Sequence, residues 1–139
     1  MLTLPIATGF YDFDPARIAN NGSYIRWLEQ GRGAWLADSP WPLKRCIDAG
    51  IAPVLVRTEI DYLRPLRLGD PIQLVLWIDG VGASIWKLRF RFQSPSEDVD
   101  YAVARQHGCF IDLTSGAPIR MPRELRAYLD QSAATPPPH

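Results

Sequence analysis

Two carboxylates stand two residues apart near the start of the chain, within the segment YDFDPARIANNGSYIRW at residues 11–27. On an extended backbone Asp12 and Asp14 share one face, and two carboxylates held this close favour a proton on one of them. Such a group can act as a general base. Pro15 directly follows the second acid, however, and Asp-Pro pairs also begin turns. The residues alone therefore leave open a catalytic acid or an ordinary turn.

A helix is predicted directly after this segment, because apolar residues recur at helical spacing from Tyr24 to Trp35. Ser23 can cap its first turn, and Asn20 and Asn21 compete for the same position. The segment Ser-Pro-Trp-Pro at residues 39–42 ends the helix. The carboxylates thus lie just ahead of a helix N-terminus.

Two glycines, Gly31 and Gly33, fall inside the predicted helix. Each costs a helix about 1 kcal/mol relative to Ala, so a packing gain is needed to offset them. We expect both glycines to allow a close approach between the helix and a sheet.

The remaining residues predict an antiparallel sheet. One strand precedes the helix, and four strands separated by turns follow it. In the strand over 84–93, apolar residues alternate with Lys87, Arg89 and Arg91, which places these cations on the outer face. One strand, one long helix and four consecutive strands indicate an α+β fold with a single antiparallel sheet against one helix. The predicted strands cover residues 3–11, 53–63, 72–79, 84–93 and 101–113, and a short helix is predicted over 122–129.

The length and charge of the chain exclude several classes of protein. A chain of 139 residues fits one domain, and fifteen basic residues balance fifteen acidic ones, which does not favour nucleic acid as a partner. No apolar run approaches the roughly 20 residues that span a membrane, and the first residues lack the pattern of a signal peptide. We expect a cytoplasmic protein with one domain over residues 1–130 and a disordered, Pro-rich tail over residues 131–139.

The string YDFDPARIANNGSYIRWLE, followed by DYLRPLRLGD at residues 61–70, resembles the hotdog-fold acyl-CoA thioesterases of the 4-hydroxybenzoyl-CoA thioesterase type. The resemblance runs from about Ile6 to Leu113. It implies a hotdog fold, in which a curved antiparallel sheet of about five strands wraps around one long central helix. It also implies hydrolysis of an acyl-CoA, or of an acyl-carrier-protein thioester, in a homodimer or homotetramer with active sites between subunits.

Carried over residue by residue, the resemblance gives the catalytic role to Asp14, as a nucleophile or as the base that activates water. Asp12 is then expected to hold the backbone in place. The oxyanion would be bound by a backbone N–H near Asn21, at a helix N-terminus that offers free N–H groups and a partial positive charge. Asn20 and Arg17 complete the polar candidates beside the thioester.

The resemblance also implies an acyl pocket between subunits, lined partly by Tyr24 and by the strand around Val56 and Thr58. The outward cations of the strand over 84–93 are either solvated or positioned to meet the phosphates of CoA. No metal is expected, because His107 and His139 are the two histidines of the chain and His139 lies in the tail. No cofactor is expected beyond coenzyme A, which is part of the substrate.

Three positions depart from the family pattern. Arg17 replaces a common Gly, Ile18 replaces a His found in some members, and Phe10 replaces a Tyr found in some members. These departures keep open a non-catalytic acyl-CoA-binding hotdog protein. A hotdog dehydratase or hydratase is a further alternative, although these enzymes use a His and residues 11–27 contain none.

Overall fold

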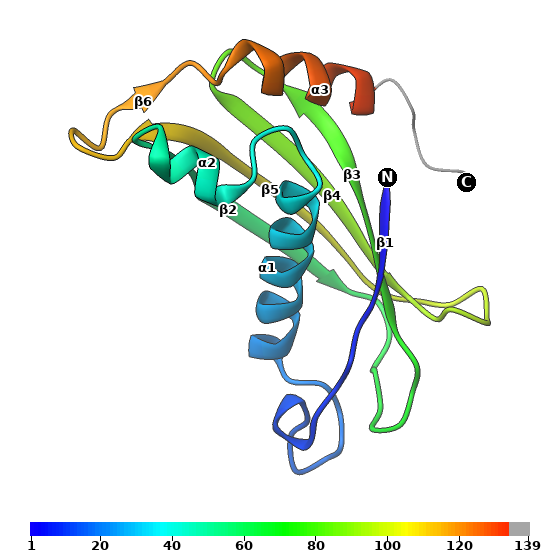
Figure 1. Cartoon of the computed structure of the whole chain (residues 1–139). Helices are drawn as coiled ribbons and strands as arrows, with labels where there is room; N and C mark the ends of the chain where they lie inside the picture. The colour runs from blue at the N-terminus through cyan, green and yellow to red at the C-terminus, as the bar shows by residue number, and fades with distance from the viewer. Residues whose placement is uncertain (134–139) are drawn as a thin grey trace.

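The computed structural model describes residues 1–133, which form a six-stranded antiparallel sheet with three α-helices (Figure 1). The strand order is β1-β3-β4-β5-β2, and β6 pairs with β5 beside this path. In chain order the elements are β1 (Leu2–Pro5), a 3₁₀ turn (Phe10–Asp12), α1 (Asn21–Ala37), α2 (Leu43–Asp48), β2 (Ile51–Tyr62), β3 (Gln73–Val81), β4 (Ile85–Gln93), β5 (Asp100–Asp112), β6 (Pro118–Ile119) and α3 (Arg123–Ala133).

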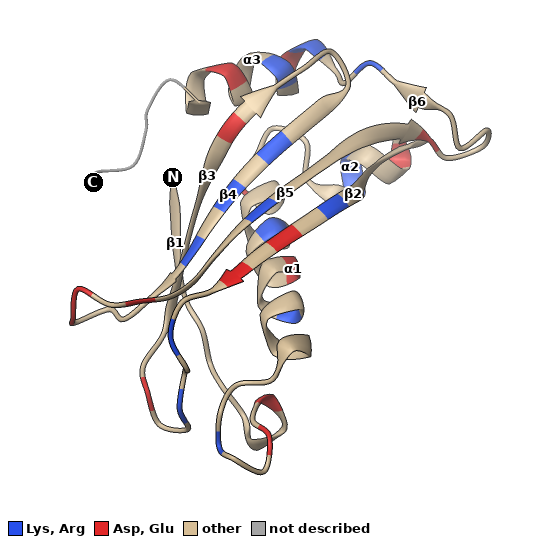
Figure 2. Ribbon diagram, turned by 180° about the vertical axis from the view of Figure 1, so that it is seen from behind, with Lys and Arg blue, Asp and Glu red and all other residues tan. Residues whose placement is uncertain are grey.

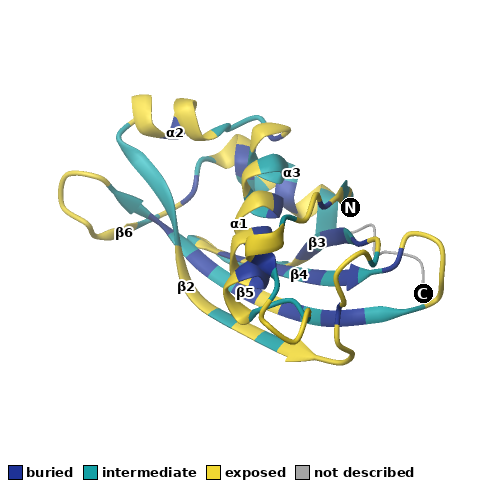
Figure 3. Cartoon of the chain, turned by 90° about the horizontal axis from the view of Figure 1, so that it is seen from below, coloured by how far each residue is buried: buried dark blue, intermediate teal, exposed yellow. Residues whose placement is uncertain are grey.

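The longest helix, α1, packs one side against the sheet (Figures 1 and 3). Tyr24, Trp27 and Leu28 on this side are buried in the core. At Gly31 a Cβ atom would lie 2.5 Å from Cδ2 of Leu74, so the close approach expected at this glycine is confirmed.

The second glycine of α1 behaves differently. Gly33 is exposed, and a Cβ atom built there meets no atom within 4 Å among the residues that the structure describes. The expectation of close packing at Gly33 is therefore wrong, because two residues along a helix turn the backbone by about 200° away from the sheet.

Strand alternation follows the predicted faces in β4. Four of its five apolar positions are buried in the core and the first, Ile85, is exposed, whereas its basic positions lie on the outer face of the sheet, where Figure 2 shows Lys and Arg spaced along the strand. The buried positions of β4 are Trp86, Leu88, Phe90 and Phe92.

Several predicted boundaries are corrected. The first strand ends at Pro5, and part of the segment predicted as its continuation forms the 3₁₀ turn. Helix α1 begins at Asn21, two residues before the first proposed cap. The sheet has six strands rather than about five. The short helix predicted over 122–129 is confirmed as α3, and α2 is a further helix that was not predicted. Helix α2 was missed because its six residues are too few to display a helical period.

At the C-terminal end, α3 extends to Ala133, three residues into the segment predicted as a tail. The rest of that predicted tail lies outside the described residues. None of the helices in residues 1–133 is long and apolar enough to cross a membrane. The antiparallel sheet and its helices are consistent with the hotdog fold.

Candidate functional site

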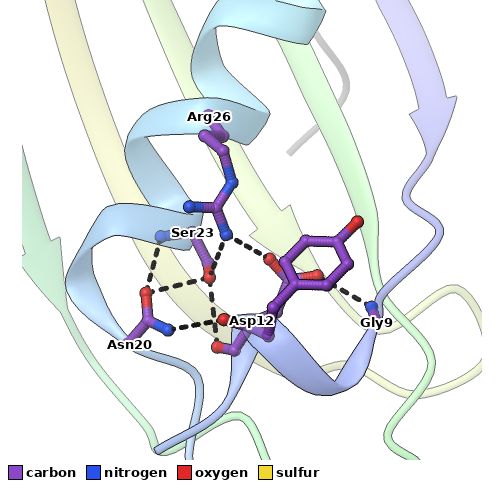
Figure 4. A network of polar contacts seen from close by, with 6 residues as sticks. Gly9, Asp12, Asn20, Ser23 and Arg26 are labelled. Atoms are coloured by element: carbon purple, nitrogen blue, oxygen red, sulfur yellow. Dashed lines mark hydrogen bonds and ion pairs between the residues drawn. The ribbon is translucent and has the colours of Figure 1, made fainter.

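The first carboxylate, Asp12, is buried between the turn and α1, with 1% of its surface exposed (Figure 4). Its Oδ2 accepts a hydrogen bond from the N–H of Gly9 at 2.8 Å, and its Oδ1 accepts one from Nη2 of Arg26 at 2.6 Å. Its backbone carbonyl accepts from the N–H of Asn20 and from Oγ of Ser23. Asp12 thus joins the turn to the first two turns of α1, in agreement with the scaffolding role expected for it.

The ionised form of Asp12 is favoured by these contacts. Burial raises the pKa of Asp12, but the Gly9 N–H and the Arg26 guanidinium together outweigh burial and leave the pKa below its usual value. The carboxylate is therefore charged at neutral pH and engaged on both oxygens. An acid held in this way is poorly suited to take up a proton during a reaction.

The second carboxylate, Asp14, is exposed on the surface of the turn. Its Oδ1 accepts hydrogen bonds from the N–H of Ala16 at 2.8 Å and the N–H of Ile18 at 3.2 Å. Within residues 1–133, both hydrogen bonds to this carboxylate end on the same oxygen, and Oδ2 accepts none. The turn therefore orients the carboxylate and leaves one oxygen for chemistry.

Arg17 occupies the tightest point of this turn, with a φ of 61°. The left-handed region is unfavourable for residues with a Cβ atom and favours glycine. Two backbone hydrogen bonds hold Arg17 in this conformation. The N–H of Arg17 donates to the Asp14 carbonyl, and the carbonyl of Arg17 accepts from the N–H of Leu68. Its guanidinium is not the partner of Asp12, because Arg26 fills that role.

The start of α1 is capped by Asn20, which settles the competition among the three possible caps. Oδ1 of Asn20 accepts from the N–H of Ser23 at 2.9 Å, and Nδ2 donates to the carbonyl of Tyr11 at 3.0 Å. Asn21 is the first residue of the helix, and its exposed side chain accepts a hydrogen bond from the hydroxyl of Tyr62 on β2. The cap thus links the 3₁₀ turn to the helix N-terminus.

The residues expected around an acyl pocket lie in different environments. Tyr24 is buried, in edge-to-face contact with Tyr62 and Phe92, and burial together with the neighbouring tyrosines raises its pKa to about 12. Val56 is 62% exposed on the edge strand, at a bulge that interrupts the register of β2 with β5. Thr58 accepts a hydrogen bond from Nε2 of Gln106 at 3.0 Å. The isolated chain does not bring these three residues into one pocket.

Two contributors to the site were missed from the sequence. Arg26 holds Asp12, and Tyr62 reaches Asn21 from the far end of β2. Helical spacing does place Arg26 one turn after Ser23, but nothing in the spacing indicates that the preceding turn folds back onto it. The contact of Tyr62 with Asn21 depends on how β2 packs beside the helix, and no sequence pattern near either residue indicates it.

The outer-face cations of β4 are largely paired. Nε of Arg89 lies 2.8 Å from Asp79, and Nε of Arg91 lies 3.4 Å from Asp100. In residues 1–133, no three His, Cys, Asp or Glu side chains cluster as metal ligands.

A family model described as "Thioesterase-like superfamily" matches residues 8–129 of the chain. A protein of Aquifex aeolicus, provisionally named an esterase, is 26% identical over 120 residues, which are 86% of this chain and 91% of that protein. YneP of Bacillus subtilis, provisionally named an acyl-CoA thioesterase, is 23% identical over 115 residues, 83% of each chain. The structure of SAV2348 from Staphylococcus aureus in complex with CoA has a TM-score of 0.91 at 12% identity, over 99% of this chain and 86% of that chain.

Proposed function

Because the chain belongs to the thioesterase-like superfamily, we propose that it hydrolyses the thioester of an acyl-CoA to a free acid and CoA. The family match supports thioester hydrolysis in general. The choice of an acyl-CoA is supported by the name of the Bacillus subtilis relative and by the CoA bound to the structurally similar Staphylococcus aureus protein. Coenzyme A enters as part of the substrate, and the proposed reaction uses no separate cofactor.

Asp14 is the residue that carries the proposed chemistry. Its carboxylate either removes a proton from the water that attacks the thioester carbon or attacks that carbon itself. When water attacks, the C–S bond breaks, the proton taken up by Asp14 passes to the CoA thiolate, and the acyl group ends as a carboxylic acid. When Asp14 attacks, the C–S bond breaks as a mixed anhydride forms on Asp14; water then cleaves this anhydride, which releases the carboxylic acid, restores the Asp14 carboxylate and supplies the proton of the CoA thiol. The observation that supports this role is the exposed carboxylate, held through one oxygen by the N–H groups of Ala16 and Ile18.

The proposed oxyanion site is the N-terminus of α1. The first N–H groups of a helix have no partner within the helix and carry the partial positive charge of its N-terminus. Removal of one such donor in other enzymes costs about 2.7–4 kcal/mol of transition-state stabilisation. The N–H near Asn21 is assigned to the thioester oxygen, with Asn20 fixing the helix start and Arg17 within the Asp14 turn.

The proposed assembly is a homodimer or homotetramer of the 4-hydroxybenzoyl-CoA thioesterase type, with α1 as the central helix of a hotdog fold. The acyl pocket then lies between subunits, beside Tyr24, Val56 and Thr58. The exposure of Val56 on an edge strand supports this arrangement, because an exposed apolar residue on an edge is available to a second chain.

A non-catalytic acyl-CoA-binding protein is the second candidate. The hydrogen bonds of Asp14 to its own turn also fit a purely structural acid, and this observation favours the alternative. The two candidates differ in one measurable respect, which is the release of the thiol.

The test is thiol release from short-chain, medium-chain, long-chain and aromatic acyl-CoAs by the wild-type protein and by Asp14→Asn. Asparagine keeps an oxygen that accepts from Ala16 and Ile18, so the turn is preserved while the base is lost. We expect turnover to fall by about 10²–10⁴-fold, the usual contribution of a general base. Asp98→Asn, in an exposed loop, is the matched control and should retain full activity. Undiminished turnover in Asp14→Asn would exclude Asp14, and binding without thiol release would favour the second candidate.

A further inference from the structure

A cavity of about 230 Å³ lies between α1, α3 and the inner face of the sheet. None of residues 9–21 lines it, so it is separate from the turn that carries Asp14. Large apolar side chains form most of its wall, and Leu43 and Leu55 at its border are exposed. The apolar wall includes Trp35, Leu36, Trp86, Phe110, Leu125 and Leu129.

Two charged side chains line this otherwise apolar cavity, namely Arg32, its one cation, and the exposed Glu29 one helical turn away. Nη1 of Arg32 donates to Oε1 of Gln106 at 2.7 Å, and Gln106, which is 3% exposed, donates in turn to Thr58. These two hydrogen bonds hold the guanidinium of Arg32 between the helix and the sheet. No ion pair within residues 1–133 includes Arg32.

The state of Arg32 suits it to bind an anion. Burial lowers the pKa of Arg32 and the nearby Glu29 raises it, but a guanidinium keeps its charge at neutral pH. A partly buried guanidinium has five N–H donors, of which one is used by Gln106. A carboxylate can take up two of the remaining donors side by side.

Gly33 borders the same cavity and keeps its rim clear. A Cβ atom there would meet nothing within 4 Å among the described residues, although Gly is a poorer helix former than Ala. Packing against the sheet does not account for this glycine, as it does for Gly31. A longer side chain at position 33 would extend into the space at the rim.

We propose that this cavity binds a carboxylic acid with a medium-length apolar chain, with the chain against Trp86, Phe110 and Leu129 and the carboxylate on Arg32. The volume is below the roughly 300–1,000 Å³ of pockets for drug-sized ligands, which favours a medium chain over a long one. The apolar wall excludes a polar ligand body, and the single cation selects an acid over a neutral lipid. Such an acid belongs to the class that the proposed hydrolysis releases, but its binding here requires no turnover.

The experiment compares octanoate with 1-octanol, which has the same chain without the charge. Both ligands are titrated calorimetrically into the wild-type protein, Arg32→Gln, Gly33→Leu and Gly33→Ala, after thermal unfolding has shown that each variant is folded. We expect Arg32→Gln to weaken octanoate by about tenfold to a hundredfold, the effect of one charge-assisted hydrogen bond, and to leave 1-octanol unchanged. Gly33→Leu should abolish binding of both ligands, whereas Gly33→Ala should bind both as the wild type does.

Three outcomes would overturn the proposal: no binding of octanoate, equal loss of both ligands in Arg32→Gln, or unchanged binding in Gly33→Leu. If Gly33→Leu alters the sedimentation of the protein while octanoate still binds, the glycine serves a contact between copies and the proposal fails. Octanoate binding in the expected pattern without thiol release would retain this site and reject the proposed hydrolysis. Thiol release without octanoate binding would reject this site and retain the proposed hydrolysis.

Discussion

Asp12 and Asp14 are separated by one residue but have opposite environments. Asp12 is buried and bonded on both oxygens, whereas Asp14 is exposed and bonded on one. The backbone bends between them, because Phe13 leaves the 3₁₀ turn and forms a bridge with Ala19. Two acids that look equivalent in the sequence are therefore divided into a structural residue and a candidate for chemistry.

Asp12→Asn should destabilise the protein by about 1.5–3 kcal/mol at pH 7, the range for hydrogen bonds to charged groups. Because the folded-state pKa of Asp12 is lowered, its contribution is complete above the unfolded pKa of about 3.9 and is lost as the pH falls through the folded pKa. Urea unfolding of both proteins from pH 7 down to about pH 2.5 should show the difference shrinking below about pH 3.9. A difference that grows on acidification would contradict the assignment.

Arg17→Gly should stabilise the protein by about 0.5–1 kcal/mol. The left-handed conformation costs an L-residue about 1–2 kcal/mol, and glycine gives back part of this gain through its larger entropy loss on folding. Arg17→Ala is the control, since it removes the guanidinium but keeps the Cβ atom and should gain nothing. Denaturant midpoints measure both effects, and equal stabilisation by Gly and Ala would show that the side chain, not the backbone, is strained.

At the scale of the element, α1 uses its two glycines for different purposes. Gly31 lies over β3 and β4, where Leu74, Leu76 and Phe90 come within 4 Å of the position of a Cβ atom. Gly33 is exposed beside the cavity that Arg32 lines. Thus Gly31 allows the helix to contact the sheet, whereas Gly33, two residues later, leaves the rim of the cavity open.

Gly33→Ala should therefore raise the free energy of unfolding by about 1 kcal/mol, because helix propensity improves and nothing is displaced. Gly31→Ala should lie about 1–3 kcal/mol below Gly33→Ala, since the new methyl group must displace the fully buried Leu74. Thermal or urea unfolding of the two single variants gives the comparison directly. Equal stabilities would mean that the core beneath Gly31 accommodates the added methyl group without loss of stability.

At the scale of the whole molecule, the sheet ends at β2, a strand of 12 residues that pairs on one side with β5. Within residues 1–133 its other edge pairs with no strand. Leu55, Val56 and Tyr62 on this strand are exposed. An edge of this length with exposed apolar residues is suited to contact a second copy.

Val56→Lys should shift the proposed dimer or tetramer toward monomer, because a lysine on an edge strand opposes association with another chain. Analytical ultracentrifugation should show the dissociation constant rising by more than about tenfold. Ile85→Lys is the matched control, since Ile85 is also exposed but lies on the inner strand β4. Val56→Lys that sediments as the wild type would place the interface elsewhere.

Local patterns were enough to predict the helix after the acids and the outward cations of β4. These features depend on side-chain periodicity and turn chemistry, which act over a few residues. The position of Gly33, the bulge at Val56 and the ion pair of Asp12 with Arg26 were not accessible in this way. Each of them is set by how one element meets another.

The sequence by itself determined an α+β chain with a carboxylate turn ahead of a helix, because hydrophobic alternation and capping residues are local properties. Only the tertiary structure decided which carboxylate is free. The turn packs Asp12 against Arg26 of α1 and leaves Asp14 at the surface, and burial is a property of the packed molecule. The same packing decided that Arg32 and Gly33 border an apolar cavity, since the cavity wall comes from strands and from α3 far along the chain.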